Sequence, residues 1–302
     1  MGKTAFIFPG QGAQYTGMGK DFYEQFSVSR QVIEKASKVT GLDIPALCFE
    51  ENPSLHITKY TQIAMLAVEI AMLRAVEEQG IHSQVHGGLS LGEYGALTAS
   101  GAISEEDAFW AVLKRGLFMQ EAVPEGGAMA AVLGTEAALI EEICEKTEGI
   151  VSIANYNCPG QIVITGEAEA VSKAGGALKD AGARRIVPLK VSGPFHSQML
   201  MGAGEQLKEV LEHMKIQDFS IPYVTNVTGE YVTDKAEVKK LLVRQVSSPV
   251  RWQQCVETMI QDGVDTFIEI GPGKTLTGFL RKIDRNVRAL NIEKTADLEK
   301  LL

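Results

Sequence analysis

Residues 85–97 decide the fold, and their centre reads Gly88-Leu89-Ser90-Leu91-Gly92. A short strand is expected to end at Gly87-Gly88, and a helix is expected to begin just past Ser90 and run through Leu97. A serine between a strand and a helix, with glycines two residues away on either side, is typical of a strained turn that exposes the hydroxyl. The stretch therefore predicts an α/β fold with Ser90 as a candidate nucleophile. A purely structural turn explains most isolated matches to this pattern and stays open as the alternative.

Strands and helices alternate on both sides of this turn. We expect a helix-rich region from Gly17 to Val39 and a helix from Thr58 to Glu78. Another helix should run to Met119, with Ser104 as its N-cap. The remaining expected elements are strands at 4–8, 266–270 and 287–290 and helices at 234–246 and 275–282. This alternation indicates a mainly parallel sheet covered on both faces.

Residues 128–190 have a pattern of their own. Strands are expected at 129–133, 150–154, 161–165 and 185–191. One helix should follow an N-cap at Thr135 and run to about Lys146, and a second helix should span 167–181. The order β-α-β-β-α-β is that of a ferredoxin-like unit. We therefore expect an α/β fold with a hydrolase-like large domain (1–125 and 195–302) and an inserted ferredoxin-like small subdomain (126–194).

Composition narrows the class of protein. The chain has 302 residues and a net charge of −9, which disfavours nucleic acid as its main partner. We expect no membrane-spanning segment and no signal peptide, because no apolar run is long enough and residues 1–8 lack a cleavage pattern. The four cysteines are scattered and are expected to be reduced thiols of a cytoplasmic protein.

A serine nucleophile needs a base, and the sequence offers five histidines. His56, His82 and His213 lie in polar or charged segments, and His86 lies within the strand before the turn. His196 directly follows the inserted unit, at a strand end where catalytic groups often sit. A structural or solvated role for His196 stays open. A carboxylate or a backbone carbonyl would orient the imidazole, and spacing selects neither.

Together these residues resemble the malonyl-CoA:acyl carrier protein transacylases of fatty acid and polyketide synthesis. The resemblance covers nearly the whole chain, and its landmarks occur in the order of that family. They are Phe8-Pro9-Gly10-Gln11-Gly12, residues 88–94, Lys114-Arg115-Gly116, residues 127–130, residues 155–161, residues 191–197, residues 243–245 with 249–252, and Gly271-Pro272-Gly273-Lys274.

The resemblance implies a role for each matching residue. Ser90 would carry the acyl group as an ester, His196 would act as its base, and the backbone carbonyl of Gln245 would orient the imidazole. The backbone N–H groups of Gln11 and Leu91 would form the oxyanion hole.

Arg115 would bind the free carboxylate of a malonyl group, which a guanidinium can hold through two hydrogen bonds. Phe195 and Met129 would line the acyl pocket, and Asn155 would contact the pantetheine arm. Core packing remains the alternative for Met129, and a turn role remains the alternative for Asn155. One departure is Leu89, where the family most often has histidine, and this puts acyl selectivity in doubt.

The implied reaction is ping-pong transfer of malonyl from malonyl-CoA to acyl carrier protein, without metal or redox cofactor. We expect the protein to be a monomer. Docking of an acidic carrier to this acidic chain needs a local basic rim. The candidates are Arg184, Arg185, Lys190, Lys274, Arg281 and Lys282. Two rival interpretations remain, a serine hydrolase or thioesterase and a non-enzymatic scaffold subunit. A thioesterase would need neither Arg115 nor the rim.

Overall fold

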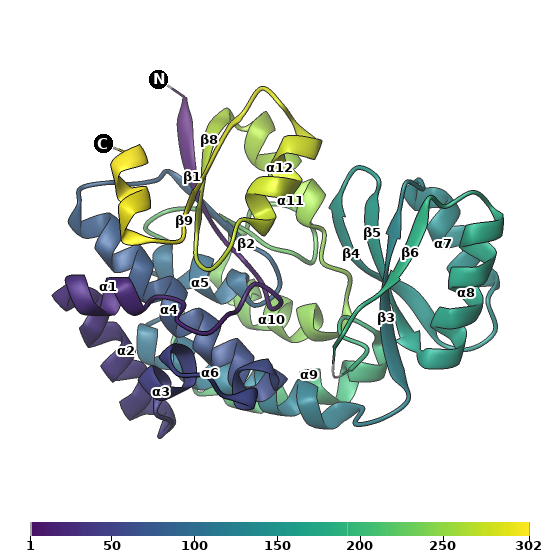
Figure 1. Ribbon diagram of the computed structural model, residues 1–302, viewed down its shortest axis with the longest axis horizontal. Coiled ribbons are helices and arrows are strands. Elements are labelled where there is room, and N and C mark those ends of the chain that lie inside the picture. Colours follow the sequence, from purple (N-terminus) through teal and green to yellow (C-terminus); the bar gives the residue numbers. More distant parts are fainter. Residues whose placement is uncertain (1, 192, 302) are drawn as a thin grey trace.

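A parallel five-stranded sheet forms the centre of the larger part of the molecule (Figure 1). The computed structural model describes residues 2–191 and 193–301, so Ser192 of the 191–197 motif lies outside the described residues. The strand order is β7-β2-β1-β8-β9, and every paired neighbour runs parallel. The strands are β1 (Lys3–Phe8), β2 (Val85–Gly88), β7 (Tyr223–Val224), β8 (Val264–Ile270) and β9 (Arg288–Ile292).

Helices cover both faces of this sheet, as alternation along β1 requires. Phe6 and Phe8 pack into the core beneath the helices on one face, and Ala5 and Ile7 pack against the helices on the other. The first face carries α1 (Lys20–Gln25), α2 (Ser27–Thr40), α3 (Ile44–Phe49), α4 (Thr58–Glu78), α5 (Gly92–Ala99), α6 (Glu105–Ala122), α9 (Met201–Glu212) and α10 (Val238–Ser247). The second face carries α11 (Trp252–Gln261) and α12 (Thr275–Ile283).

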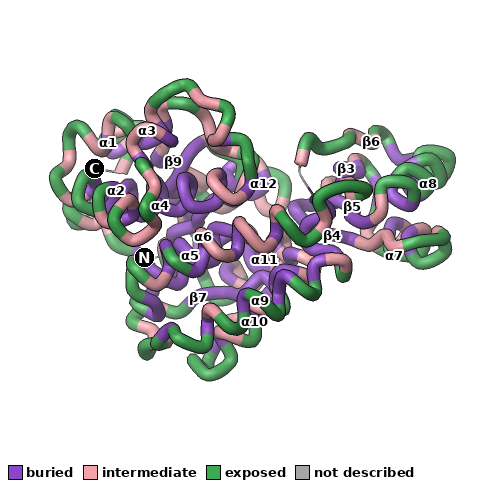
Figure 2. Tube along the Cα trace, turned by 90° about the horizontal axis from the view of Figure 1, so that it is seen from below, coloured by how far each residue is buried: buried purple, intermediate pink, exposed green. Residues whose placement is uncertain are grey.

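A separate four-stranded antiparallel sheet forms the smaller part, to the right in Figure 1. Its order is β4-β5-β3-β6, which is the ferredoxin-like order for a β-α-β-β-α-β chain. Its elements are β3 (Gly127–Leu133), α7 (Ala137–Lys146), β4 (Val151–Cys158), β5 (Gln161–Glu167), α8 (Ala168–Asp180) and β6 (Arg185–Pro188). Figure 2 shows α7 and α8 at the outer edge of the molecule, so the other face of the sheet is turned toward the larger part.

Backbone and side-chain hydrogen bonds fasten the two parts to each other. Tyr156 N donates to Val250 O at 2.9 Å, and Val250 N donates to Ala154 O at 2.8 Å. At the β4–β5 turn, Lys282 Nζ of α12 donates to Gln161 Oε1 at 3.0 Å. These contacts fix the small sheet beside the carboxyl ends of β1, β2 and β8.

Most expected elements are confirmed, and some details are wrong. The helix expected over 58–78 has these bounds, and the Ser104 hydroxyl accepts from Asp107 N as the expected N-cap. Thr135 is not an N-cap: α7 begins at Ala137 after Glu136, and Thr135 Oγ1 is buried without a hydrogen-bond partner. Gly134, at φ 78°, turns the chain after β3, so the helix starts later than expected.

The expected strand over 185–191 ends at Pro188, which has no N–H to donate. Short 3₁₀ turns complete the described secondary structure, at Pro53–His56, Gln198–Leu200, Lys235–Glu237 and Thr295–Lys300. Among the described helices, none is long and apolar enough to cross a membrane.

Candidate active site

Ser90 occupies a tight turn between β2 and α5. Its φ is 55°, in the left-handed region that non-glycine residues rarely adopt. The flanking glycines make this turn sterically possible. A Cβ at Gly88 would lie 2.0 Å from the Gly92 carbonyl carbon, and a Cβ at Gly92 would lie 2.1 Å from Phe8 O. The serine hydroxyl is therefore presented at the N-terminus of α5.

Ser90, His196 and Gln245 form a hydrogen-bonded chain. Ser90 Oγ and His196 Nε2 are 2.8 Å apart, and His196 Nδ1 lies 2.8 Å from the backbone oxygen of Gln245. The carbonyl oxygen can only accept, so Nδ1 carries the proton and Nε2 is free to accept from the serine. His196 has φ 60°, and it and Ser90 are the non-glycine residues with positive φ in the described part of the chain. Backbone strain of this kind concentrates at functional sites.

The imidazole of His196 is held in its neutral form. Burial, and then the positive charge of Arg115, lowers the pKa of His196 to about 4. A neutral imidazole at physiological pH is the form that can take a proton from a serine hydroxyl.

Arg115 of α6 is a buried cation beside the serine. It is 1% exposed, and burial is the main cause that lowers its pKa. Nη2 donates to Ser90 Oγ at 3.1 Å and to Gln245 Oε1 at 3.0 Å, and Nη1 donates to Gln62 Oε1 at 2.7 Å. Within residues 2–191 and 193–301 Arg115 forms no ion pair, and its buried Nε has no hydrogen-bond partner. An unpaired buried guanidinium is costly, and an anionic ligand would compensate it.

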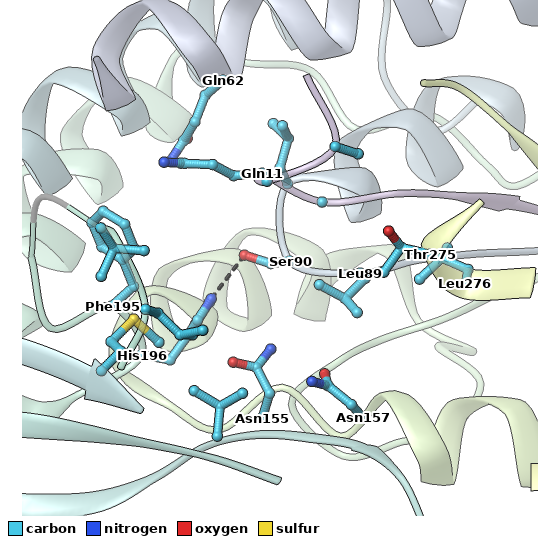
Figure 3. A pocket seen from close by; sticks show the side chains of 18 of the residues that line it. Gln11, Gln62, Leu89, Ser90, Asn155, Asn157, Phe195, His196, Thr275 and Leu276 are labelled. Carbon is cyan, nitrogen blue, oxygen red and sulfur yellow. Dashed lines mark hydrogen bonds between the residues drawn. The ribbon is translucent and has the colours of Figure 1, made fainter. Parts of the chain in front are cut away.

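A cavity of about 240 Å³ opens over Ser90, between the two parts of the molecule (Figure 3). Its lining includes the predicted site residues Gln11, Leu91, Arg115, Met129, Asn155, Phe195 and His196. In Figure 3, Gln11 and Gln62 lie on one side of Ser90, and Asn155 and Asn157 lie on the other. Met129, Asn155 and Phe195 are all buried, which suits pocket walls rather than surface positions.

Leu89 lines the same cavity, on the side of the α12 N-terminus. It packs against the core cluster that contains Leu276 and Phe279. The position where the family most often has histidine is therefore part of an apolar wall.

The other histidines lie away from the serine. His56, His82 and His213 are exposed. His86 is buried between Ser83 Oγ, 2.7 Å from Nε2, and Ser100 Oγ, 2.9 Å from Nδ1. All four cysteines are buried and unpaired. In the described residues, no group of three or more His, Cys, Asp or Glu side chains could hold a metal ion.

Three buried polar residues of the site were not predicted from the sequence. Gln62 holds Arg115, and Asn226 Oδ1 accepts from Ser90 N at 2.6 Å. Glu93 Oε2 accepts from Gln245 Nε2 at 2.6 Å and from Asn226 N at 3.1 Å. Gln62 did carry a partial signal, because it is a polar residue directly before the apolar run 63–68 of α4. Glu93 and Asn226 have no comparable signal, since their meeting depends on the tertiary fold.

Comparisons with known proteins show the family of the chain. Residues 5–297 match the family described as the acyl transferase domain. The malonyl CoA-acyl carrier protein transacylase of Bacillus subtilis (strain 168) is 44% identical over 304 residues, which cover 99% of this chain and 96% of that protein.

Two solved structures have the same fold over the whole chain. The crystal structure of MCAT from Streptococcus pneumoniae has a TM-score of 0.96 and 47% identity, covering 99% of each chain. A malonyl-transacylase solved in complex with its type II PKS acyl-carrier protein has a TM-score of 0.96 and 40% identity, also covering 99% of each chain.

Proposed function

The chain belongs to the malonyl CoA-acyl carrier protein transacylases, within the acyl transferase domain family, and from this we propose its reaction. It transfers a malonyl group from malonyl-CoA to the phosphopantetheine thiol of acyl carrier protein and so supplies extender units for fatty acid synthesis. The observation that carries the proposal is the unpaired Arg115 guanidinium, 3.1 Å from the Ser90 hydroxyl. In a malonyl ester on Ser90, a single methylene group separates the free carboxylate from the ester carbonyl carbon. This short length suits a carboxylate that pairs with Arg115.

In the first half-reaction, His196 Nε2 takes the Ser90 hydroxyl proton while Oγ attacks the thioester carbonyl of malonyl-CoA. The negative charge that develops on the carbonyl oxygen is stabilised by the backbone N–H groups of Gln11 and Leu91. The intermediate collapses, the C–S bond breaks, and the imidazolium returns its proton to the CoA sulfur. The backbone carbonyl of Gln245 holds the imidazole in the required tautomer throughout.

In the second half-reaction, the carrier thiol gives its proton to His196 and attacks the Ser90 ester. Collapse now breaks the C–O bond, and Ser90 Oγ regains a proton from the imidazolium. The acyl donor and the acyl acceptor use one site in turn, which is a ping-pong mechanism. Arg115 pairs with the malonyl carboxylate, and a neutral acyl group would leave this buried cation unpaired, so such groups are rejected. Phe195, Met129 and Asn155 form the walls of the pocket and of the pantetheine channel.

The cavity lies in the crevice between the proposed large domain (1–125 and 195–302) and small subdomain (126–194). We place the carrier protein at the rim of this crevice. Leu133 pairs with Gln161 on one neighbouring strand and with Arg185 on the other, so Gln161 and Arg185 lie at the same end of the small sheet. Lys282 of α12 contacts Gln161 at this end. Exposed basic side chains therefore gather at one end of the small sheet, where an acidic carrier would find complementary charge. They are Arg184, Arg185, Arg281 and Lys282.

Lys190 and Lys274 extend the proposed rim elsewhere. Both are exposed and adjoin cavity residues, since Leu189 and Thr275 line the cavity. We further propose that the protein acts as a monomer in the cytoplasm. Four buried, unpaired thiols support that location, because oxidising compartments favour disulfides. The molecular mass of the purified protein in analytical ultracentrifugation tests whether it is a monomer in solution.

A transfer assay tests the proposed reaction and its main rival. The protein is incubated with malonyl-CoA, with and without phosphopantetheinylated acyl carrier protein, and both malonylated carrier and free malonate are quantified. A transacylase forms malonylated carrier much faster than malonate, with parallel double-reciprocal plots. Malonate formed at the same rate with and without carrier would identify a thioesterase instead. If neither malonylated carrier nor free malonate forms, the scaffold interpretation is favoured.

A further inference from the structure

A buried side chain from a distant part of the chain holds both ends of the strained turn at Ser90. Asn226 is 0% exposed and follows β7. Its Oδ1 accepts from Ser90 N at 2.6 Å, and its Nδ2 donates to Gly88 O at 2.7 Å. The amide therefore bridges the end of β2 and the serine, on either side of Leu89. A left-handed non-glycine residue is strained and persists only when its surroundings impose it.

The carbonyl group of Ser90 is fixed as well. Ser90 O accepts from Gln245 Nε2 at 3.0 Å and from Glu93 N at 3.2 Å. With the peptide groups before and after Ser90 both held, the two backbone dihedrals of the serine are determined. A peptide group is planar and trans, so the N–H of Leu91 points away from Ser90 O. The direction of that N–H therefore depends on how the serine backbone is held.

Asn226 is itself held on both sides. Its N donates to Glu93 Oε2 at 3.1 Å, and its O accepts from Arg251 N at 3.0 Å. Glu93 also accepts from Gln245 Nε2, so the two amides that hold Ser90 share one anchor. The arrangement leaves Asn226 little freedom to move relative to the serine.

We propose that Asn226 is a positioning residue for acyl transfer: its side-chain amide holds Ser90 in the left-handed conformation and thereby aims the Leu91 N–H at the developing oxyanion. Asn226 touches neither substrate nor reacting atoms in this role. The inference rests on the proposed function, since it assigns a purpose to the Leu91 N–H in that reaction.

The test compares Asn226→Leu with the wild-type protein in the malonyl-CoA half-reaction. A donor that acts on the oxyanion stabilises the transition state and not the bound thioester. We therefore expect kcat for malonylation of Ser90 to fall about 10- to 100-fold, since misplacement of about 1 Å can cost 10²-fold. KM for malonyl-CoA should change by less than about 2-fold.

Asn52→Leu is the matched control. Asn52 Nδ2 donates to backbone oxygens of Ala46, Leu47 and Glu50, and its Oδ1 accepts from Leu55 N. It also fixes a loop through both ends of its amide, but it lies outside the cavity over Ser90. Both variants should lower the midpoint of thermal unfolding, and only Asn226→Leu should lower kcat of the folded protein.

The inference is overturned by a wild-type kcat in Asn226→Leu, or by equal losses of kcat in the two variants. If Asn226→Leu does not fold, Asn226→Asp replaces it. The aspartate keeps an acceptor for Ser90 N, has no donor for Gly88 O and adds a carboxylate beside Glu93. A kcat about 10-fold below wild type is expected there, and an unchanged kcat overturns the inference. Failure of the wild-type protein to form any malonyl adduct would instead contradict the proposed function.

Discussion

At the scale of single residues, the site combines a neutral base with an unpaired cation. Arg115 lies within 3.1 Å of Ser90 Oγ and lowers the pKa of His196 in addition to burial. The same guanidinium therefore keeps the base unprotonated and leaves a positive charge available for an acyl carboxylate. Acyl selectivity and the pH dependence of loading both follow from this arrangement.

Arg115→Ala should abolish the preference for malonyl-CoA. Truncating one partner of a buried charge pair costs about 2–5 kcal/mol, so kcat/KM for malonyl-CoA should fall about 30-fold or more. Acetyl-CoA has no free carboxylate, so Arg115→Ala should react with it at least as fast as the wild-type protein does. Adduct formation from both esters measures this, with Arg285→Ala on the exposed surface as the control. Equal losses for the two esters would contradict the role of Arg115.

The rate of Ser90 malonylation should stay constant down to an unusually low pH. The pKa of His196 is about 4, against an ordinary value of 6.5, and only the neutral imidazole can accept the serine proton. As pH falls, kcat/KM should therefore stay level until pH approaches 4, and then decline as His196 becomes protonated. Rapid-quench measurements of kcat/KM for malonylation across this pH range provide the test, with circular dichroism to verify folding at each pH. An acidic limb near pH 6.5 would contradict it.

At the scale of elements, α4 carries a buried carboxyl group beside α5 and the turn that follows β8. Glu69 is 0% exposed, and neither carboxyl oxygen has a hydrogen-bond partner in the described structure. Gly95 and Gly271 leave the space that its side chain fills. Burial, and then the nearby charge of Glu269, raises the pKa of Glu69 well above its ordinary value.

Glu69→Gln should stabilise the protein increasingly as pH rises. The folded state binds the Glu69 proton more tightly than the unfolded state, so its contribution is fully present below the unfolded pKa. That contribution is lost as pH rises toward the folded pKa. Glutamine has no proton to lose, so the variant's advantage in free energy of unfolding should be larger at pH 8 than at pH 5. Urea unfolding measures it, with Glu209→Gln on the exposed surface of α9 as the control. An advantage independent of pH would contradict the assignment.

Sequence patterns predicted those elements whose signals are local. The apolar spacing of 58–78 and the Ser104 cap are examples, and both are confirmed. The N-cap at Thr135 was wrong because the chain turns at Gly134. Among site residues, the glycine pattern around Ser90 pointed to a nucleophile, whereas the roles of Gln11, Arg115 and Gln245 came from the family resemblance. Glu93 and Asn226 could not be predicted, since their partners lie more than 130 residues away in the chain.

At the scale of the whole molecule, the site lies between two sheets of different kinds. The parallel sheet presents Ser90 at the carboxyl end of β2, and the antiparallel sheet supplies Met129 and Asn155 to the facing wall. Backbone bonds of Ala154 and Tyr156 with Val250 keep these walls in register. Because the net charge is −9, an acidic carrier must approach along a locally basic path.

Lys282→Glu should slow discharge of the malonyl group onto acyl carrier protein. A reversed charge at a docking rim mainly lowers the association rate, and we expect a loss of about 10-fold at low salt. The loss should shrink as ionic strength rises, because salt screens exposed charges. Preloaded protein mixed with carrier at several salt concentrations measures this. Lys38→Glu on α2, outside the crevice, should match the wild type, and equal effects of both variants would contradict a rim at α12.

The most direct test of the central claim is the intact mass of the protein after brief mixing with malonyl-CoA. The wild-type protein should gain one malonyl group, and Ser90→Ala should gain none. Acetyl-CoA should give little adduct, and added phosphopantetheinylated acyl carrier protein should remove the malonyl group faster than buffer does. A malonyl adduct that persists in Ser90→Ala, or no adduct on the wild-type protein from any acyl-CoA, would contradict a serine-ester transacylase.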